Sequence, residues 1–171
     1  MALSPQKFRE VVLQLLFAQD YEKTAVEESA MLLRKELGLS KTVAVEATDR
    51  VQRLLEEVEA LDCQIAEASN AYDWVRIPMV ERNVLRLGLY ELTLDEDIPP
   101  KVAISEAMRL ARKFSTPEAA TFINAVLDHL YKRQLGEEDT ASDVSETFDQ
   151  FVASTDAARE VGEQEAHDEE V

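Results

Sequence analysis

The fold of this chain follows from residues 77–92, which read IPMVERNVLRLGLYEL. Ile77 and Pro78 begin a helical segment in which apolar residues point in nearly every direction around the helix axis. A helix that is apolar nearly all round is buried, because it offers no broad polar face to solvent. We therefore expect a domain in which this helix lies at the centre and other elements pack against it.

The segments on both sides of this helix have the periodicity of amphipathic helices. In the first of them, Phe8, Val11, Val12, Leu15 and Leu16 are spaced i, i+3, i+4, i+7 and i+8, which places them on one face. Glycine and proline are scarce, with four and five residues, which disfavours strands joined by tight turns. The sequence predicts an all-α fold, a compact bundle of about seven helices. The expected helices cover residues 5–20, 25–37, 41–60, 65–72, 78–92, 101–114 and 117–135, with a break at residues 61–62.

The net charge of −17 is concentrated at the C-terminal end of the chain. Residues 136–171 carry 13 acidic residues and one basic residue, which leaves a net charge of −5 for residues 1–135. In this end segment Val144, Phe148 and Phe151 support at most one or two marginal helical turns. We expect a helical domain over residues 1–135 and an acidic, disordered tail over residues 136–171. A basic patch on the domain is compatible with the acidic total, because binding follows the local field.

No combination of residues in the sequence predicts catalysis. The two histidines, His129 and His167, are far apart, and no GxGxxG or GxxxxGK[ST] loop is present. The one cysteine, Cys63, forms no intrachain disulfide, and a buried, inert thiol in a reducing compartment is the favoured interpretation. The N-terminal residues lack the uninterrupted apolar run of a signal peptide or a membrane span. We expect a cytoplasmic protein that is not an enzyme, with no catalytic residues, no metal site and no cofactor.

Three segments resemble one known family in their order and spacing. They read VLRLGLYEL at residues 84–92, DIPPKVAISEA at residues 97–107 and FINAVLD at residues 122–128. These segments resemble the C-terminal half of the NusB family of transcription antitermination factors, and the helix from Phe8 to Asp20 looks like the first helix of that family. The resemblance covers residues 8–134, although residues 22–75 are similar in helix count more than in letters.

The resemblance implies a fold of two small helical bundles packed together. It implies binding of boxA-type, single-stranded RNA together with the ribosomal protein NusE, within the antitermination complex of RNA polymerase and in support of ribosomal RNA transcription. Two other functions stay open. One is a protein-binding helical adaptor that has lost most of its RNA affinity. The other is the RNA-binding module of a ribosomal RNA cytosine methyltransferase, which would share the helices but needs a further catalytic domain.

The resemblance also suggests which residues contact RNA. The family begins with an arginine-rich run, whereas only Lys7 and Arg9 are basic here, so we expect modest RNA affinity without the protein partner. Phe17 and Phe122 are candidates for stacking against unstacked bases, with a position in the core as the alternative for each. The predicted RNA-binding set is Lys7, Arg9, Gln14, Phe17, Arg86, Lys101 and Phe122.

Contacts with the protein partner are assigned to charged residues of the fifth and seventh expected helices, Glu81, Arg82 and Glu118. Arg82 and Arg86 are four residues apart and share one helix face, with ordinary surface charge as the alternative for both. A further basic cluster ends the sixth expected helix, and favourable interaction with the helix dipole is its preferred explanation. That cluster consists of Arg109, Arg112 and Lys113.

Overall fold

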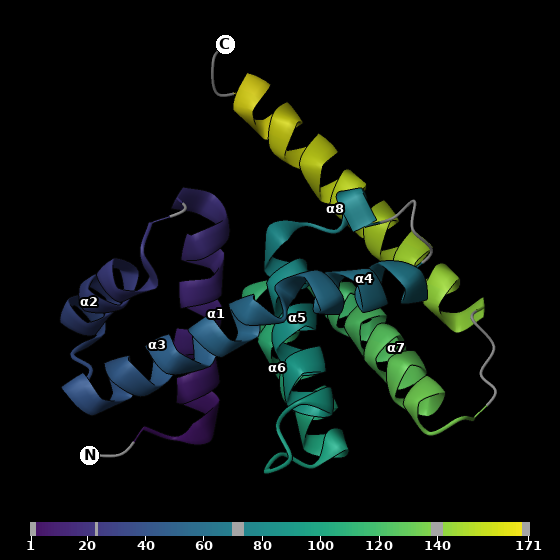
Figure 1. The fold of residues 1–171 in the computed structure, drawn as a ribbon. Helices are drawn as coiled ribbons and strands as arrows, with labels where there is room; N and C mark the ends of the chain where they lie inside the picture. Colours follow the sequence, from purple (N-terminus) through teal and green to yellow (C-terminus); the bar gives the residue numbers. More distant parts are fainter. Residues whose placement is uncertain (1–2, 23, 70–73, 138–141, 169–171) are drawn as a thin grey trace.

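The computed structural model describes residues 3–22, 24–69, 74–137 and 142–168, and within these ranges all regular secondary structure is helical (Figure 1). This confirms the expected all-α fold. The helices are α1 (Pro5–Glu22), α2 (Val26–Leu37), α3 (Lys41–Glu56), α4 (Val58–Ala68), a 3₁₀ helix (Trp74–Arg76), α5 (Met79–Thr93), α6 (Pro100–Phe114), α7 (Pro117–Gln134) and α8 (Ser142–Asp168). None of these described helices combines the length and the apolar character that crossing a bilayer requires.

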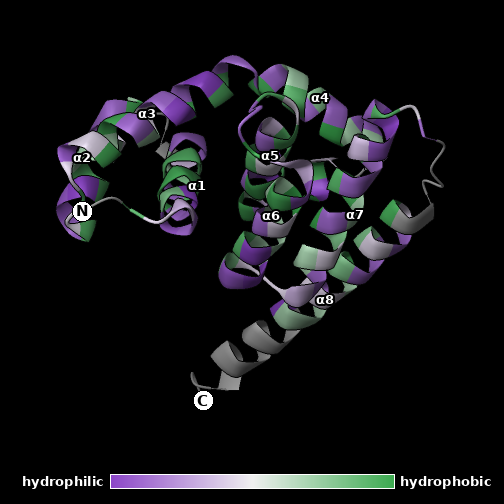
Figure 2. Ribbon diagram, turned by 90° about the horizontal axis from the view of Figure 1, so that it is seen from below, coloured by the Kyte–Doolittle hydropathy of each residue, from purple (hydrophilic) through white to green (hydrophobic). Residues whose placement is uncertain are grey.

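The helices form two groups that α1 joins. Helices α1, α2 and α3 pack against one another, and α4 to α7 form the second group (Figures 1 and 2). Helix α1 also packs along α5, so that its apolar side serves both groups. The two packed bundles implied by the family resemblance are therefore present, and α1 and α3 both contact the second group.

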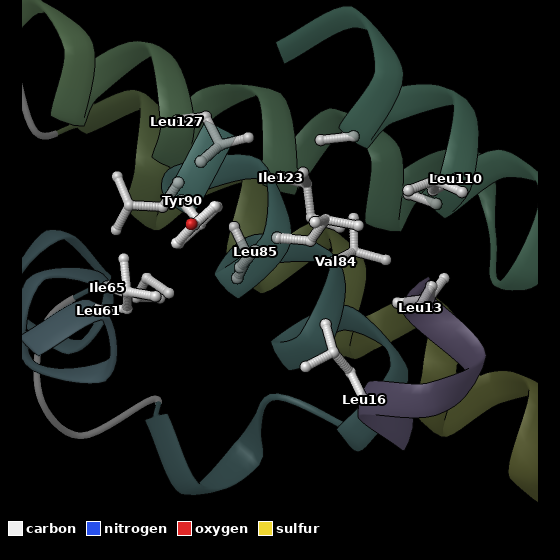
Figure 3. Close-up of a cluster of buried hydrophobic side chains, with 14 of the residues drawn as sticks. Leu13, Leu16, Leu61, Ile65, Val84, Leu85, Tyr90, Leu110, Ile123 and Leu127 are labelled. Carbon is white, nitrogen blue, oxygen red and sulfur yellow. The ribbon is translucent and has the colours of Figure 1, made fainter. Parts of the chain in front are cut away.

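Helix α5 lies at the centre of the second group, as its sequence predicts. Every residue from Asn83 to Leu92 is buried, and side chains from α1, α4, α6 and α7 surround it (Figure 3). Gly88 makes the closest packing possible. A Cβ atom at this position would lie 2.8 Å from Leu127 Cδ1 of α7 and 3.0 Å from Ala107 Cβ of α6. The missing side chain therefore lets three helices approach one another at one point.

Local signals in the sequence fix several helix ends. The side chains of Ser40 and Thr116 accept hydrogen bonds from the backbone N–H groups three residues later, at 3.2 and 3.1 Å. Gly38 ends α2 with φ of 62°, in the left-handed region that glycine adopts at little cost. These caps lie at ends of the expected helices 25–37, 41–60 and 117–135, because a cap depends on neighbouring residues alone.

The break between α3 and α4 lies at Glu57, whereas the sequence suggested residues 61–62. The physical reason is packing: Leu61 and Ile65 are fully buried and four residues apart, so both belong to the inner face of one continuous α4. Cys63 then lies on the outer side of α4 and is exposed, which corrects the expectation of a buried thiol. The last residue of the expected 65–72 helix, Tyr72, lies outside the described residues.

The acidic end of the chain differs from the expected disordered tail. It contains α8, which packs against α7. Val144, Phe148 and Phe151 are spaced i, i+4 and i+7 and are each at most 2% exposed. The Phe148 and Phe151 rings lie 5.2 and 5.7 Å from the ring of Phe122 on α7. Composition suggested disorder because apolar residues are few, but these three side chains meet a complementary apolar face that only the folded domain provides.

Candidate nucleic-acid interface

One stripe of α1 faces solvent. Lys7, Gln14, Phe17 and Tyr21 are spaced so that they share one side of the helix, opposite the buried Val12 and Leu16. The Phe17 side chain is 40% exposed and its ring stacks on that of Tyr21, with 6.5 Å between the ring centroids. An aromatic ring held this way at the surface offers a face to another ring or to an apolar side chain.

An apolar groove of about 470 Å³ runs beside this stripe. Phe17 and Gln14 form its α1 side, and Leu32, which is 63% exposed, forms its α2 side. Phe114 at the end of α6 closes it and is 37% exposed. Exposed apolar side chains gathered from three helices are typical of a surface that binds another protein. Gln14 and Phe17, two of the predicted RNA-binding residues, therefore lie together in one recess.

Three cations lie next to this groove, around the carboxylate of Glu10. Lys7 Nζ, Arg109 Nη1 and Lys113 Nζ donate to the two Glu10 oxygens at 3.0, 2.8 and 2.7 Å. Burial on its own would raise the pKa of Glu10, but the hydrogen bonds from Lys113, Lys7 and Arg109 outweigh it and lower the pKa to about 2. Lys113 Nζ also lies 5.5 Å from the centroid of the Phe114 ring, which lines the groove. The cationic cluster and the apolar groove are therefore parts of one surface.

Sequence reasoning missed the part that Arg109 and Lys113 play here. It explained both by the dipole of α6, and α6 does carry Arg112 and Lys113 in its last turn. The structure brings them to Glu10, which is about 100 residues away in the sequence, and Arg109 Nη2 also donates to the backbone oxygen of Gln6 at 3.1 Å. The spacing of Arg109 and Lys113, four residues apart, placed them on one helix face but gave no information about which helix lies opposite.

Two predicted RNA-binding arginines are engaged inside the protein, and this corrects their assignment. Arg9 is 7% exposed, and its Nε lies 2.8 and 2.9 Å from the two carboxylate oxygens of Glu91. Arg86 is equally buried and donates to Asp62 at 2.6 and 2.7 Å. Each guanidinium already has carboxylate partners and contacts little solvent, so neither is placed to receive a phosphate.

The predicted RNA contact of Phe122 is also corrected, and Lys101 lies away from the other predicted RNA-binding residues. The Phe122 ring is fully buried beneath Phe148 and Phe151 of α8, which leaves it no face for a base. Lys101 is exposed in the first turn of α6. Twelve residues separate it from Lys113, which is about 18 Å along a helix, so it lies far from the cationic cluster.

Of the predicted partner-binding residues, one is buried, one is partly buried and one is exposed. Glu81 is 4% exposed and accepts a hydrogen bond from the hydroxyl of Ser115, so it ties α5 to the corner between α6 and α7 and is not a surface contact. Arg82 is partly buried, donates to the backbone oxygen of Ile77 at 3.1 Å and lies over the Trp74 ring. Glu118 is exposed in the first turn of α7, where a contact with a partner stays a prediction.

Comparison with known proteins agrees with this fold. A family model described as the NusB family matches residues 6–132, which is most of the chain. The chain belongs to the NusB family. It is 37% identical to the transcription antitermination protein NusB of Geobacter sulfurreducens over 126 residues, which are 71% of this chain and 89% of that protein. It is 34% identical to the transcription antitermination protein NusB of Trichlorobacter lovleyi over 122 residues, 71% of this chain and 86% of that protein.

Solved NusB structures share the helical arrangement. The structure of T. maritima NusB has a TM-score of 0.67 and 27% identity, with 77% of this chain and 93% of that chain covered. A chain from the crystal structure of the antitermination factors NusB and NusE in complex with double-stranded RNA has a TM-score of 0.66 and 26% identity, with 75% and 96% covered. The NusB match ends at residue 132, so α8 lies beyond the part of the chain that defines the family.

Proposed function

We propose that this chain is a transcription antitermination factor that binds boxA-type, single-stranded RNA together with the ribosomal protein NusE. It acts in the cytoplasm, within the antitermination complex of RNA polymerase, and supports transcription of ribosomal RNA. Its activity is binding, and no reaction is assigned to it. Membership of the NusB family supports the proposal, and one observation on this chain carries it: an exposed aromatic groove continues into a cluster of cations on α1 and α6.

The groove suits a protein partner. Phe17, Leu32 and Phe114 leave between a third and two thirds of their surface in water, and covering each of them contributes on the order of 1 kcal/mol. Aromatic side chains in a recess are the residues that dominate the energy of protein interfaces. We assign the groove to NusE on these grounds.

The adjoining cations suit RNA. Phosphate contacts supply most of the affinity of a protein for nucleic acid, and Lys7 and Lys113 are exposed at the surface. The number of such contacts is small, and the whole chain carries a net charge of −17. RNA affinity of the isolated chain is therefore modest and depends strongly on salt, and NusE raises it by adding contacts of its own.

The second function, a protein-binding adaptor that has lost most of its RNA affinity, is not favoured by the names of the similar proteins, but one observation on this chain keeps it as the competing hypothesis. Arg9 and Arg86 form buried ion pairs, so they do not enlarge the cationic surface. The two functions share the groove and differ only in whether the cations bind RNA. One set of measurements separates them.

The test is capture of NusE by the full-length chain, followed by titration of boxA RNA with and without NusE. Phe17→Ala removes an exposed ring from the groove and is expected to weaken NusE capture about tenfold. Leu135→Ala removes an exposed apolar side chain at the far end of α7 and serves as the matched control, with no expected change. RNA binding by the pair supports the antitermination factor. Capture of NusE with no RNA binding supports the adaptor, and failure to capture NusE contradicts both.

A further inference from the structure

Glu10 lies beneath the three cations that surround it. Its side chain is 8% exposed, whereas the side chains of Lys7, Lys113 and Arg109 are 61%, 43% and 26% exposed. The cations come from two helices, α1 and α6, and converge on one carboxylate. The arrangement is a layer of positive charge at the surface with a single anion below it.

The cations keep donors free after they bind Glu10. An ammonium group has three N–H donors, and each lysine uses one on Glu10. Arg109 is more fully engaged, with Nη1 on Glu10, Nε on Glu106 at 2.9 Å and Nη2 on the Gln6 backbone oxygen. Arg109 therefore holds the two helices together, whereas Lys7 and Lys113 are more exposed and each use one donor on Glu10.

Glu10 also offsets the repulsion between the cations. Three positive groups within hydrogen-bonding distance of one carboxylate repel one another, and the repulsion falls when an anion sits between them. Without that anion the long side chains of Lys7 and Lys113 would separate and sample many rotamers, and a ligand would have to order them on binding. The carboxylate stays ionised across the physiological range, because its pKa is about 2.

We propose that Lys7, Arg109 and Lys113 form a subsite for one phosphate group of the RNA backbone, and that Glu10 is the positioning residue that holds these cations in place. This inference rests on the proposed RNA-binding function and adds the subsite to it. A phosphate has several acceptor oxygens, which suits donors that arrive from two directions. Phe114 follows Lys113 directly and lines the groove assigned to NusE, so the phosphate subsite lies at the edge of the protein-binding groove.

The subsite explains how this chain binds RNA with few basic residues at its N-terminus. Of the two expected there, Arg9 is buried and Lys7 alone is exposed. Helix α6 supplies the other two cations, Arg109 and Lys113, from a distant part of the sequence. They reach the same surface as Lys7 because α1 packs against the second group of helices.

The test measures how the RNA affinity of the full chain depends on salt concentration. BoxA RNA is titrated in the presence of NusE, and a short oligouridine is titrated with the chain alone. Lys113→Gln is expected to lower RNA affinity about tenfold and to reduce the slope of log affinity against log salt by about 0.7. Arg133→Gln removes one positive charge from the exposed end of α7 and is the matched control, with affinity and slope unchanged. Equal behaviour of Lys113→Gln and Arg133→Gln would overturn the subsite.

The positioning role of Glu10 is tested by a double-mutant cycle with Glu10→Gln. If Glu10 acts by holding Lys113, the loss caused by Lys113→Gln is at least threefold smaller in the Glu10→Gln background than in the natural chain. Additive effects would overturn that role. Far-UV circular dichroism and the melting temperature verify that each variant folds. If Glu10→Gln does not fold, the single variants Lys113→Gln and Arg109→Gln still test the phosphate subsite.

These outcomes separate the subsite from the wider function. If the natural chain binds boxA RNA with NusE and Lys113→Gln binds equally well, the subsite is wrong and the antitermination function stands. If Lys113→Gln weakens the capture of NusE and leaves RNA binding unchanged, the cations bind an acidic protein segment and the subsite is again wrong. If the natural chain captures NusE but binds neither RNA, both the subsite and the RNA-binding function fail.

Discussion

Arg9 and Glu91 form a buried ion pair that holds α1 against α5. The Nε atom of Arg9 lies 2.8 Å from one carboxylate oxygen of Glu91 and 2.9 Å from the other, and the two side chains are 9% and 5% exposed. Arg9 Nη1 also lies 3.6 Å from Glu106 on α6. Taking two charges out of water is costly and is tolerated only when each has its partner. Arg9 therefore ties α1 both to α5 and to α6, the helix that carries Arg109 and Lys113.

Arg9→Met is expected to destabilise the fold by about 3 kcal/mol, because it leaves Glu91 buried without its cation. Burial already raises the pKa of Glu91 in spite of Arg9, and removal of Arg9 raises it further. A carboxyl group with a raised folded-state pKa is destabilising at high pH and much less so at low pH, so the deficit shrinks as the solution is acidified. Urea denaturation at several pH values measures it.

Lys7→Met is the control for this prediction. It removes a cation two residues earlier, from a side chain that is 61% exposed, and its effect on stability is expected to stay below about 0.5 kcal/mol. Equal effects of Arg9→Met and Lys7→Met would contradict the assignment of Arg9 to the core.

Gly88→Ala is expected to destabilise the protein by about 1 kcal/mol, even though alanine favours helices. The added Cβ would lie 2.8 Å from Leu127 Cδ1 and 3.0 Å from Ala107 Cβ, closer than packed carbon atoms approach. The strain outweighs the gain in helix propensity because Ala107 has no rotamer by which to move away. Thermal unfolding of the variant measures the difference.

The double variant Gly88→Ala with Leu127→Val checks the cause. Shortening Leu127 makes room for the new methyl group, so the two changes together should cost less than the sum of their separate effects. A strictly additive result would show that the contact with Leu127 is not the source of the strain.

Phe148→Ala is expected to release α8 from α7. Phe148 packs edge to face on Phe122, and Arg76 lies 5.6 Å from the centroid of its ring. Most of the stability of a helix in a protein comes from packing of its apolar face, so the helicity of α8 depends on its docking against α7. Hydrogen exchange should become faster throughout α8 while α5 stays protected. Gln150→Ala, on the exposed side of α8, is the control, and unchanged exchange in Phe148→Ala would contradict the docked arrangement.

Glu10→Gln is expected to change how stability depends on acid. The pKa of Glu10 is about 2 in the folded chain, below the ordinary value of 4.5. A lowered folded-state pKa means that the ionised group stabilises the fold above pH 4.5 and that this contribution is lost as the pH falls toward 2. Melting temperatures should therefore fall more steeply for the natural chain than for Glu10→Gln over that interval. Parallel curves would show that Glu10 is not held by the three cations.

Features of the fold that depend on residues close together in the sequence were predicted correctly, and features that depend on distant residues were not. The expected end of the helix 25–37 and the expected starts at residues 41 and 117 are correct, because the caps Gly38, Ser40 and Thr116 involve atoms within three or four residues. The central position of α5 also followed from its own pattern. The break at Glu57 did not, because the position of the break depends on which residues of α4 meet the core.

The candidate site was predicted less well than the fold. Gln14 and Phe17 were expected at the surface of α1 and lie in the groove. Arg9, Arg86 and Phe122 were also predicted to contact RNA, but all three are buried. Arg9 and Arg86 pair with Glu91 and Asp62, and α8 covers Phe122. The sequence does not show whether a charged or aromatic side chain faces solvent or packs against a residue that is far away along the chain.

The sequence by itself determined that the chain is helical, where most helices begin and end, and which faces are apolar, since these depend on interactions between residues a few positions apart. It also placed the chain near one family through three short segments. The tertiary structure alone decided which charges are free, since that depends on pairs such as Arg9 with Glu91 and Lys113 with Glu10, whose members are far apart along the chain. Only folding brings such groups within reach, and the low dielectric of the interior then makes each pairing strong enough to remove a residue from the surface or to hold it there.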